Sequence, residues 1–125
     1  MKEKHLLSSF SYAFQGLFYV VKTQKHMRFH FLAAILTMII CLFFKLSAQE
    51  FLLVVFAIVF VLVTEMLNTA LESMINLIAT NPHPLAKITK DVAAGGVLVA
   101  SVNAVIVGLV VFLPRLIVLV RRMVS

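Results

Sequence analysis

The sequence is poor in residues that soluble and secreted domains depend on. It has no tryptophan, one cysteine, three prolines and four glycines in 125 residues, and only 13% of its residues are charged. The single cysteine, Cys41, cannot form an internal disulfide, and its apolar neighbours in the sequence indicate a packing role. The glycines form no phosphate-binding loop of the familiar kind, because Gly95 and Gly96 fall inside a helical pattern.

Acidic residues are also scarce, with 5 Asp and Glu against 11 Lys and Arg, which gives a formal net charge of +6. Hydrophobic residues make up 62% of the chain and the mean hydropathy is +1.09, whereas a soluble domain is about half apolar. We therefore interpret the chain as a polytopic membrane protein with a single domain, residues 1–125. Its basic residues flank the apolar segments, which predicts contact with anionic lipid headgroups and a phosphate-bearing ligand, and no nucleic-acid partner.

The hydrophobic pattern predicts an all-α integral membrane fold. Residues 1–28 repeat apolar side chains at helical spacing, which predicts an amphipathic helix on the membrane surface. Three longer apolar stretches predict transmembrane helices at residues 29–46, 50–79 and 92–113.

Prolines and one polar tetrapeptide mark the predicted helix ends. The tetrapeptide from Ser47 to Glu50 supplies a helix cap between the first two spans. Pro82 and Pro84 stop the second span, and Pro114 is expected to end the third, leaving residues 114–125 as a tail. Small residues recur every four positions in the third span, a spacing that lets another helix approach closely. This small-residue ridge consists of Gly96, Ala100, Ala104 and Gly108.

The basic residues predict the orientation in the membrane. Five lysines and arginines lie in the first 28 residues, two lie in the 80–90 loop, and Lys45 is alone in the loop between the first two spans. The positive-inside rule then places the N-terminus and the 80–90 loop in the cytoplasm, in a multi-pass protein of the plasma (inner) membrane. With three spans the basic residues 115, 121 and 122 fall on the external side, which disagrees with the positive-inside rule. We keep this orientation because the first helix usually determines it.

The stretch from Glu65 to Asn76 places polar residues within an apolar helix. Glu65, Asn68, Thr69 and Glu72 recur at steps of three, four and seven, so they share one helix face, and Asn76 extends it by a turn. Ionised groups at membrane depth are costly and usually pair, bind ions or do chemistry. Two nearby carboxylates also repel, and a bound cation relieves that repulsion. The alternative is the water-exposed end of a membrane helix.

The predicted orientation brings further polar residues to the same side of the membrane. They are Asn81, His83, Lys87, Lys90 and Asp91. Carboxylates for Mg²⁺, lysines for phosphates and a water-accessible loop indicate a metal-assisted phosphoryl-transfer site. Two other classes stay open: a small proton-coupled transporter that uses Glu65 as an intramembrane acid, and a non-catalytic membrane scaffold assembled through the small-residue ridge.

Three motifs make the chain resemble the small bacterial membrane kinases of the diacylglycerol kinase and undecaprenol kinase family. They are Glu65-Met-Leu-Asn-Thr-Ala-Leu-Glu72, His83-Pro-Leu-Ala-Lys87 and Lys90-Asp91-Val-Ala-Ala-Gly-Gly96, and the resemblance covers about residues 8–116. It implies a homotrimer of three-span protomers with composite active sites. It also implies transfer of the ATP γ-phosphate to a lipid hydroxyl, with the active site at the cytoplasmic face.

The resemblance implies roles for individual residues as well. Glu65 would be the general base on the lipid hydroxyl, and Asn68 would orient it. Glu72 would bind the Mg²⁺ that accompanies ATP, and Lys90 would hold the β- and γ-phosphates. The other residues expected near the nucleotide are Asn81, His83 and Asp91. These roles agree with chemistry, since a carboxylate in a partly apolar site can accept a proton and a second acid and a lysine neutralise phosphate charge.

Two positions depart from the family pattern by losing an acid. Gln24 stands where the family usually has an acid that helps to bind the metal, and Asn76 stands where it usually has Asp. A metal site of Glu72 and Gln24 is expected to bind Mg²⁺ less tightly, because an amide oxygen is a weaker ligand than a carboxylate. A catalytically inactive relative is the alternative that these losses raise.

The motifs are closer to the undecaprenol kinases of Gram-positive type than to the diacylglycerol kinases. Undecaprenol is therefore the first expected substrate and diacylglycerol the second. Both lipids present a primary alcohol on apolar chains, so the residues alone do not separate them.

Overall fold

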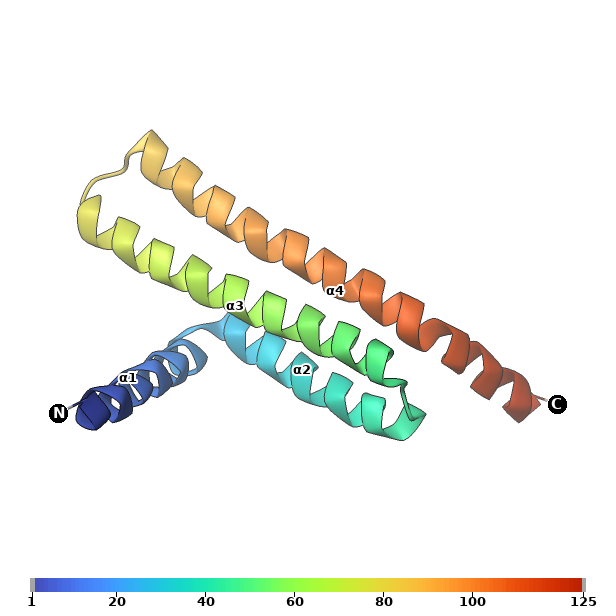
Figure 1. The fold of residues 1–125 in the computed structure, drawn as a ribbon. Helices are drawn as coiled ribbons and strands as arrows, with labels where there is room; N and C mark the ends of the chain where they lie inside the picture. The colour runs from blue at the N-terminus through green and yellow to red at the C-terminus, as the bar shows by residue number, and fades with distance from the viewer. Residues whose placement is uncertain (1, 125) are drawn as a thin grey trace.

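The computed structural model describes residues 2–124, and the side chains of residues 6–124, as an all-helical chain, which confirms the all-α part of the expected fold (Figure 1). Its helices are α1 (Lys2–Thr23), α2 (Lys25–Phe44), α3 (Ala48–Ile78) and α4 (Pro84–Val124). Helices α3 and α4 form a long antiparallel hairpin. Helix α2 packs along the first half of α3, and α1 turns away from α2 and touches α3 only lightly.

The core lies where α2, α3 and α4 meet. Cys41, Val54 and Val111 are buried together there, one from each helix, so the packing role expected for the cysteine is confirmed. Phe44 and Phe112 add a contact between the rings of α2 and α4, with centroids 6.2 Å apart. This cluster joins the three helices near the α2–α3 connection, at the far end of the hairpin from the α3–α4 turn.

Within the described residues, three helices are long and apolar enough to cross a membrane, namely α2, α3 and α4. The 20 residues of α2 correspond to about 30 Å, which is the thickness of the hydrocarbon core. The 41 residues of α4 correspond to about 60 Å, so α4 must extend beyond it. Most large apolar side chains face outward, for example Phe43, which is 81% exposed. Outward apolar side chains suit a helix bundle whose surroundings are lipid or other apolar helices.

The capping expected between the first two spans is confirmed. The Ser47 hydroxyl accepts a hydrogen bond from the backbone N–H of Glu50 at 3.3 Å, and the Glu50 carboxylate accepts one from the backbone N–H of Ser47 at 2.9 Å. This reciprocal pair satisfies two amide groups that the first turn of a helix leaves unpaired. The chain before it turns sharply through Lys45, whose φ of 47° is left-handed.

Prolines stop α3 but do not end α4. Helix α3 ends at Ile78 and α4 begins at Pro84, the first position of a helix, where a missing N–H costs nothing. Pro114, however, lies inside α4, so the predicted end of the third span at Pro114 is wrong, and residues 114–124 are helical instead of a separate tail. Helix α4 begins at Pro84, so residues 84–91 are a helical segment that leads into the stretch 92–113 predicted to cross the membrane.

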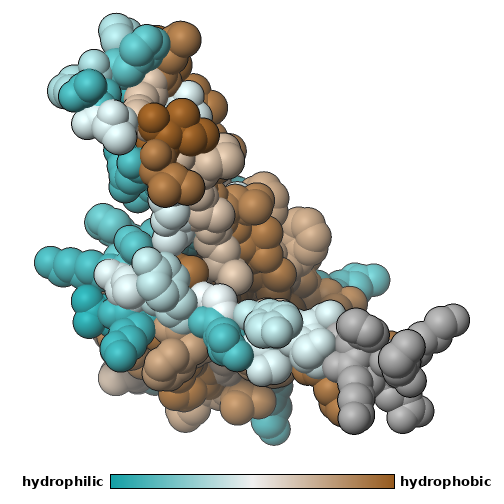
Figure 2. Space-filling model, turned by 90° about the vertical axis from the view of Figure 1, so that its left-hand side faces the viewer, coloured by the Kyte–Doolittle hydropathy of each residue, from teal (hydrophilic) through white to brown (hydrophobic). Residues whose placement is uncertain are grey.

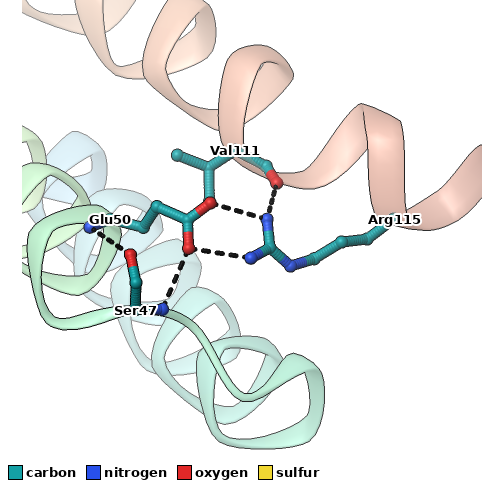
Figure 3. Close-up of polar contacts among 4 residues, drawn as sticks. All are labelled: Ser47, Glu50, Val111 and Arg115. Atoms are coloured by element: carbon teal, nitrogen blue, oxygen red, sulfur yellow. Dashed lines mark hydrogen bonds and ion pairs between the residues drawn. The ribbon is translucent and has the colours of Figure 1, made fainter.

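Arg115 contacts both the turn of α4 next to its proline and the start of α3. Pro114 has no N–H to donate, so the carbonyl of Val110, four residues earlier, lacks its usual backbone donor. The Arg115 guanidinium donates to the carbonyl of Val111 in that turn at 2.7 Å. The same guanidinium forms a bidentate ion pair with the Glu50 carboxylate of α3, with Nη1–Oε1 and Nη2–Oε2 distances of 2.9 and 2.7 Å (Figure 3). The Arg115 side chain therefore adds a hydrogen bond at the residue after the one that the proline leaves without a donor, and it fixes α4 to α3.

The first two helices meet at Gln24, four residues before the boundary expected at residue 28. Gln24 has extended backbone angles, φ −100° and ψ 116°, while its N–H donates to the carbonyl of Val20 at 2.8 Å and its carbonyl accepts from Arg28 at 3.3 Å. Its backbone groups thus stay paired across the change of direction. The basic residues 25 and 28 belong to α2 as a result.

The small-residue ridge contacts the rest of the chain unevenly. Ala100 is fully buried, at 0% exposure, whereas Gly96 is exposed. A Cβ atom added at Gly96 or at Gly108 would meet nothing within 4 Å. Part of the ridge is therefore used in the α3–α4 hairpin and part is left open.

Candidate functional site

The polar stripe of α3 is buried at Glu65 and Thr69, half-buried at Asn68 and Glu72, and exposed at Asn76. Glu65 and Thr69 are each only 4% exposed, and they continue the buried face that Val54, Ala57 and Val61 begin. Glu50 lies opposite Arg115 at one end of the hairpin and Asn76 lies opposite Lys90 near the other. In an antiparallel pair with this register, Glu65 falls at the level of Ala100, whose small side chain is itself fully buried.

Two acceptor groups in this stripe have no partner. Among the described residues, nothing donates a hydrogen bond to the Glu65 carboxylate, and the Thr69 hydroxyl beside it donates instead to the Glu65 carbonyl at 3.0 Å. The Oδ1 atom of Asn68 is buried and has no hydrogen-bond partner in the same part of the chain. Buried polar atoms are normally paired, so the unpaired oxygen of Asn68, one turn from a carboxylate that accepts no hydrogen bond from the described residues, indicates a place for a further group.

Glu72 is half-buried and lies nearer the α3–α4 turn. It is seven residues from Glu65, or about 10.5 Å along the axis at standard helical rise. Within residues 6–124, no group of three or more His, Cys, Asp or Glu side chains is arranged to hold a metal ion. The oxygens of Glu72 and Asn68, one helical turn apart, are nevertheless the hard donors that Mg²⁺ prefers, and Mg²⁺ commonly takes only one or two carboxylates from the protein. The donor chemistry therefore fits a magnesium ion that obtains other ligands elsewhere.

Gln24 is not joined to this stripe in a single chain. Its side-chain amide donates to the hydroxyl of Thr23 at 3.4 Å, and no hydrogen bond links it to Glu72 among the described residues. The structure thus places Gln24 at the α1–α2 junction, half-buried, without bringing it together with the second predicted metal ligand.

A groove of about 590 Å³ lies at the tip of the hairpin, between the end of α3 and the start of α4. Three predicted site residues, Asn81, His83 and Lys90, line it, together with Lys87 and apolar residues. The ring of His83 is oriented by its Nδ1 atom, which accepts the backbone N–H of Leu85 at 3.2 Å. Figure 2 shows hydrophilic side chains gathered at this tip, above the more hydrophobic flank of the hairpin. The size suits a small-molecule ligand.

The two lysines of the groove are held differently. Lys90 Nζ donates to Asn76 Oδ1 at 2.6 Å, which links α4 to α3. Lys87 instead forms an ion pair with Asp91 one turn along α4, and both side chains are well exposed, so this pair contributes little to stability. Asp91 therefore lies outside the groove lining, unlike the other residues predicted near the nucleotide.

One contact of the site was missed by reasoning from the sequence, whereas Lys87, which lines the groove, had been placed on this side of the membrane. Asn76 is the partner of Lys90, 14 residues away. Local spacing carries no signal for that contact, because it depends on how residues 79–83 turn the chain.

Comparisons with known proteins identify the family. The prokaryotic diacylglycerol kinase family matches residues 11–112 of the chain. The undecaprenol kinase of Bacillus subtilis is 39% identical over 108 residues, which cover 86% of this chain and 88% of that protein. The diacylglycerol kinase of Synechocystis is 40% identical over 113 residues, which cover 90% of this chain and 65% of that protein. The diacylglycerol kinase of Escherichia coli is 26% identical over 101 residues, 81% of this chain and 83% of that protein. The chain therefore belongs to the prokaryotic diacylglycerol kinase family, whose named members are phosphotransferases for lipid alcohols.

Proposed function

We propose that this protein is an ATP-dependent lipid kinase that phosphorylates the hydroxyl of undecaprenol. The observation that carries the proposal is Glu65, a buried residue whose carboxylate accepts no hydrogen bond from the described residues, in a chain of a lipid kinase family. The undecaprenol kinase of Bacillus subtilis supports the choice of lipid, because the match spans nearly the whole of both proteins. Diacylglycerol is the second candidate, supported by the equally similar kinase of Synechocystis.

Glu65 would act as the general base. The lipid hydroxyl gives its proton to the Glu65 carboxylate, its oxygen forms a bond to the γ-phosphorus, and the bond between that phosphorus and the β–γ bridging oxygen breaks to release ADP. The carboxylate is suited to this step because no described residue occupies its lone pairs. The Asn68 amide lies one turn away with its own oxygen unpaired, and it would orient the hydroxyl or the carboxylate.

The phosphates of ATP would lie toward the hairpin tip. Lys90 would contact the β- and γ-phosphates, with Asn81 and His83 at the nucleotide and Asp91 at the rim. Glu72 would hold a magnesium ion, with Gln24 as a weaker ligand, and this ion would neutralise charge on the phosphates. The polar groups would thus follow the hairpin from the lipid hydroxyl at Glu65 to the nucleotide at its tip.

The same proposal includes a homotrimer with composite sites. One chain offers an incomplete set of metal ligands and leaves Gly96 open for close approach by another helix. Neighbouring protomers would supply the missing groups. Helix α1 would lie as an amphipathic helix in the headgroup layer, since its large apolar side chains are exposed in the single chain. These side chains include Leu6, Phe10, Phe14 and Phe18. The site would then face the cytoplasm in the inner membrane.

A direct assay tests the proposal. The purified protein in detergent micelles is given γ-labelled ATP, Mg²⁺ and either undecaprenol or diacylglycerol, and the extracted lipid is counted, with Glu65→Gln as the matched inactive control. We expect labelled undecaprenyl phosphate, formed faster than labelled phosphatidic acid. Label in diacylglycerol alone would contradict the choice of lipid, and absence of both label and ATP binding would contradict the kinase assignment.

A further inference from the structure

The last turns of α4 extend beyond the rest of the molecule and beyond the family match. The match ends at residue 112, but α4 continues to Val124. Because Glu50 near the start of α3 already lies opposite Arg115, the residues after about 117 have no α3 beside them. Figure 1 shows this end of α4 projecting past the α2–α3 connection. We call residues 116–124 the overhang.

The overhang is apolar on every side at its start. Leu116, Ile117, Val118, Leu119 and Val120 follow one another, and each is between 42% and 56% exposed. A helix that is apolar all round requires an apolar environment all round, which a packed partner on one face does not provide. Because α2 ends beside Pro114 and Arg115, the start of the overhang lies where the acyl chains meet the glycerol and headgroup layer, and lipid there can cover its apolar sides.

A groove of about 480 Å³ lies between the end of α2 and the overhang. Its floor is apolar, formed by Phe44, Pro114, Val118 and Leu119, and its cationic groups are Arg115 and Arg122. These arginines are seven residues apart on one face of α4, or about 10.5 Å along the axis. The groove therefore combines an apolar surface with two guanidinium groups.

Arg115 keeps donors for a further anion. A guanidinium has five N–H donors, and the described contacts of Arg115 use two on Nη1, for Glu50 and Val111, and one on Nη2, for Glu50. The Nε–H and the second hydrogen of Nη2 remain. Glu50 is the single acid at this end within residues 6–124, and its carboxylate is already engaged by Arg115 and Ser47 (Figure 3). No described carboxylate therefore competes for an anion placed between Arg115 and Arg122.

We propose that this groove binds an acidic phospholipid from the membrane leaflet opposite the candidate kinase site. The phosphate would lie between Arg115 and Arg122, and the glycerol and first acyl carbons would lie on Phe44, Val118 and Leu119. The groove lies at the depth of the lipid headgroups, because α2 is about as long as the hydrocarbon core and ends at Phe44, which lines the groove. The apolar floor favours a lipid over free phosphate. The proposal rests on the membrane crossing and not on the kinase reaction.

The absence of tryptophan gives a clean test. Phe44→Trp places one fluorophore in the groove, and Phe43→Trp places one on the neighbouring, outward-facing position as a matched control. Each full-length protein is reconstituted in phosphatidylcholine vesicles that contain a minor fraction of brominated lipid, either phosphatidylglycerol or phosphatidylcholine. Quenching then measures which lipid lies against the tryptophan.

We expect brominated phosphatidylglycerol to quench the Phe44→Trp protein more than brominated phosphatidylcholine does, with no such preference at position 43. Adding Arg122→Gln should reduce the preference roughly fivefold, which corresponds to about 1 kcal/mol for one basic residue near the membrane surface. Arg121→Gln removes the same charge next to the groove lining and should leave most of the preference. Equal quenching by both lipids at position 44, or equal losses from both arginine variants, would overturn the proposal in favour of diffuse charge attraction.

Discussion

Replacing Glu65 by glutamine separates the proposed base from the proposed metal ligand. Gln keeps the size of the side chain and its hydrogen-bonding capacity but cannot accept the proton of the lipid hydroxyl. A positioned general base contributes typically 10²- to 10⁴-fold to rate, so we expect turnover to fall by roughly that factor. Binding of Mg²⁺-ATP should be nearly unchanged, because Glu65 is about 10.5 Å along the axis from Glu72 and farther still from the hairpin tip.

The fold should tolerate this change unusually well for a buried acid. Glu65 as a residue is 4% exposed and its carboxylate accepts no hydrogen bond from the described residues, so the substitution breaks no hydrogen bond and removes the charge of a largely buried residue. We therefore expect the thermal unfolding temperature in detergent to stay the same or to rise. A loss of activity without a loss of stability then points to chemistry and not to misfolding.

Glu72→Gln is the comparison that makes the test decisive. It should weaken Mg²⁺-ATP binding by at least about tenfold, as expected when a metal site loses a supporting group, and it should lower turnover as well. Both variants are measured by nucleotide-binding titration and by lipid phosphorylation. The reasoning is refuted if Glu65→Gln loses nucleotide binding while Glu72→Gln retains it.

Three further predictions concern packing, the phosphate lysine and the metal. Ala100→Leu should destabilise the protomer by about 1–3 kcal/mol, because it overfills a fully buried position. Gly96→Leu lies in open space within one chain, so it should change only the yield of crosslinked oligomer. Equal unfolding temperatures for the two variants would contradict this prediction. Asn76→Asp should raise the KM for ATP, because an ion pair with Lys90 competes with the phosphates, and an unchanged KM would show that Lys90 does not contact them. Gln24→Glu should lower the Mg²⁺ concentration for half-maximal activity, and an unchanged dependence would mean that the α1–α2 junction does not reach the metal.

The sequence predicted the helices well and their ends less well. Long apolar runs define α2, α3 and α4, and the capping box from Ser47 to Glu50 was readable because it is local. The extension of α4 past Pro114 was not readable, because it is accompanied by a contact between residues 50 and 115 that only the folded hairpin creates. The break between α1 and α2 at Gln24 was missed because the sequence there has no proline or glycine to signal the end of a helix.

The candidate site was predictable along α3 and less so across the hairpin. The spacing of Glu65, Thr69 and Glu72 placed them on one face, and the first two are buried. Periodicity cannot tell which neighbour a helix face meets, so the pairing of Asn76 with Lys90 came only from the structure, whereas Lys87 and Asp91 lie one turn apart on the same helix and their pairing is local. The absence of a partner for the Asn68 oxygen among the described residues likewise depends on packing, although the position of Asn68 between the two acids had made it a candidate site residue.

The two polar links between α3 and α4 differ in the charge that they leave available. At the far end, Glu50 neutralises most of the charge of Arg115, so this link fixes the hairpin, and what Arg115 keeps for a further anion is its remaining N–H donors. At the candidate site, Lys90 Nζ is held by the neutral amide of Asn76, so its position is restrained while its positive charge stays uncompensated beside the groove. A phosphate that entered the groove would meet a cation already placed and not yet neutralised, which is what electrostatic stabilisation of phosphoryl transfer requires. An acid at position 76 would restrain the lysine more firmly but would take up the charge that the phosphates need. The loss of an acid at position 76 is thus compatible with a working site, whereas the loss at Gln24 weakens the metal side, and the two departures from the family pattern act in opposite directions on nucleotide binding.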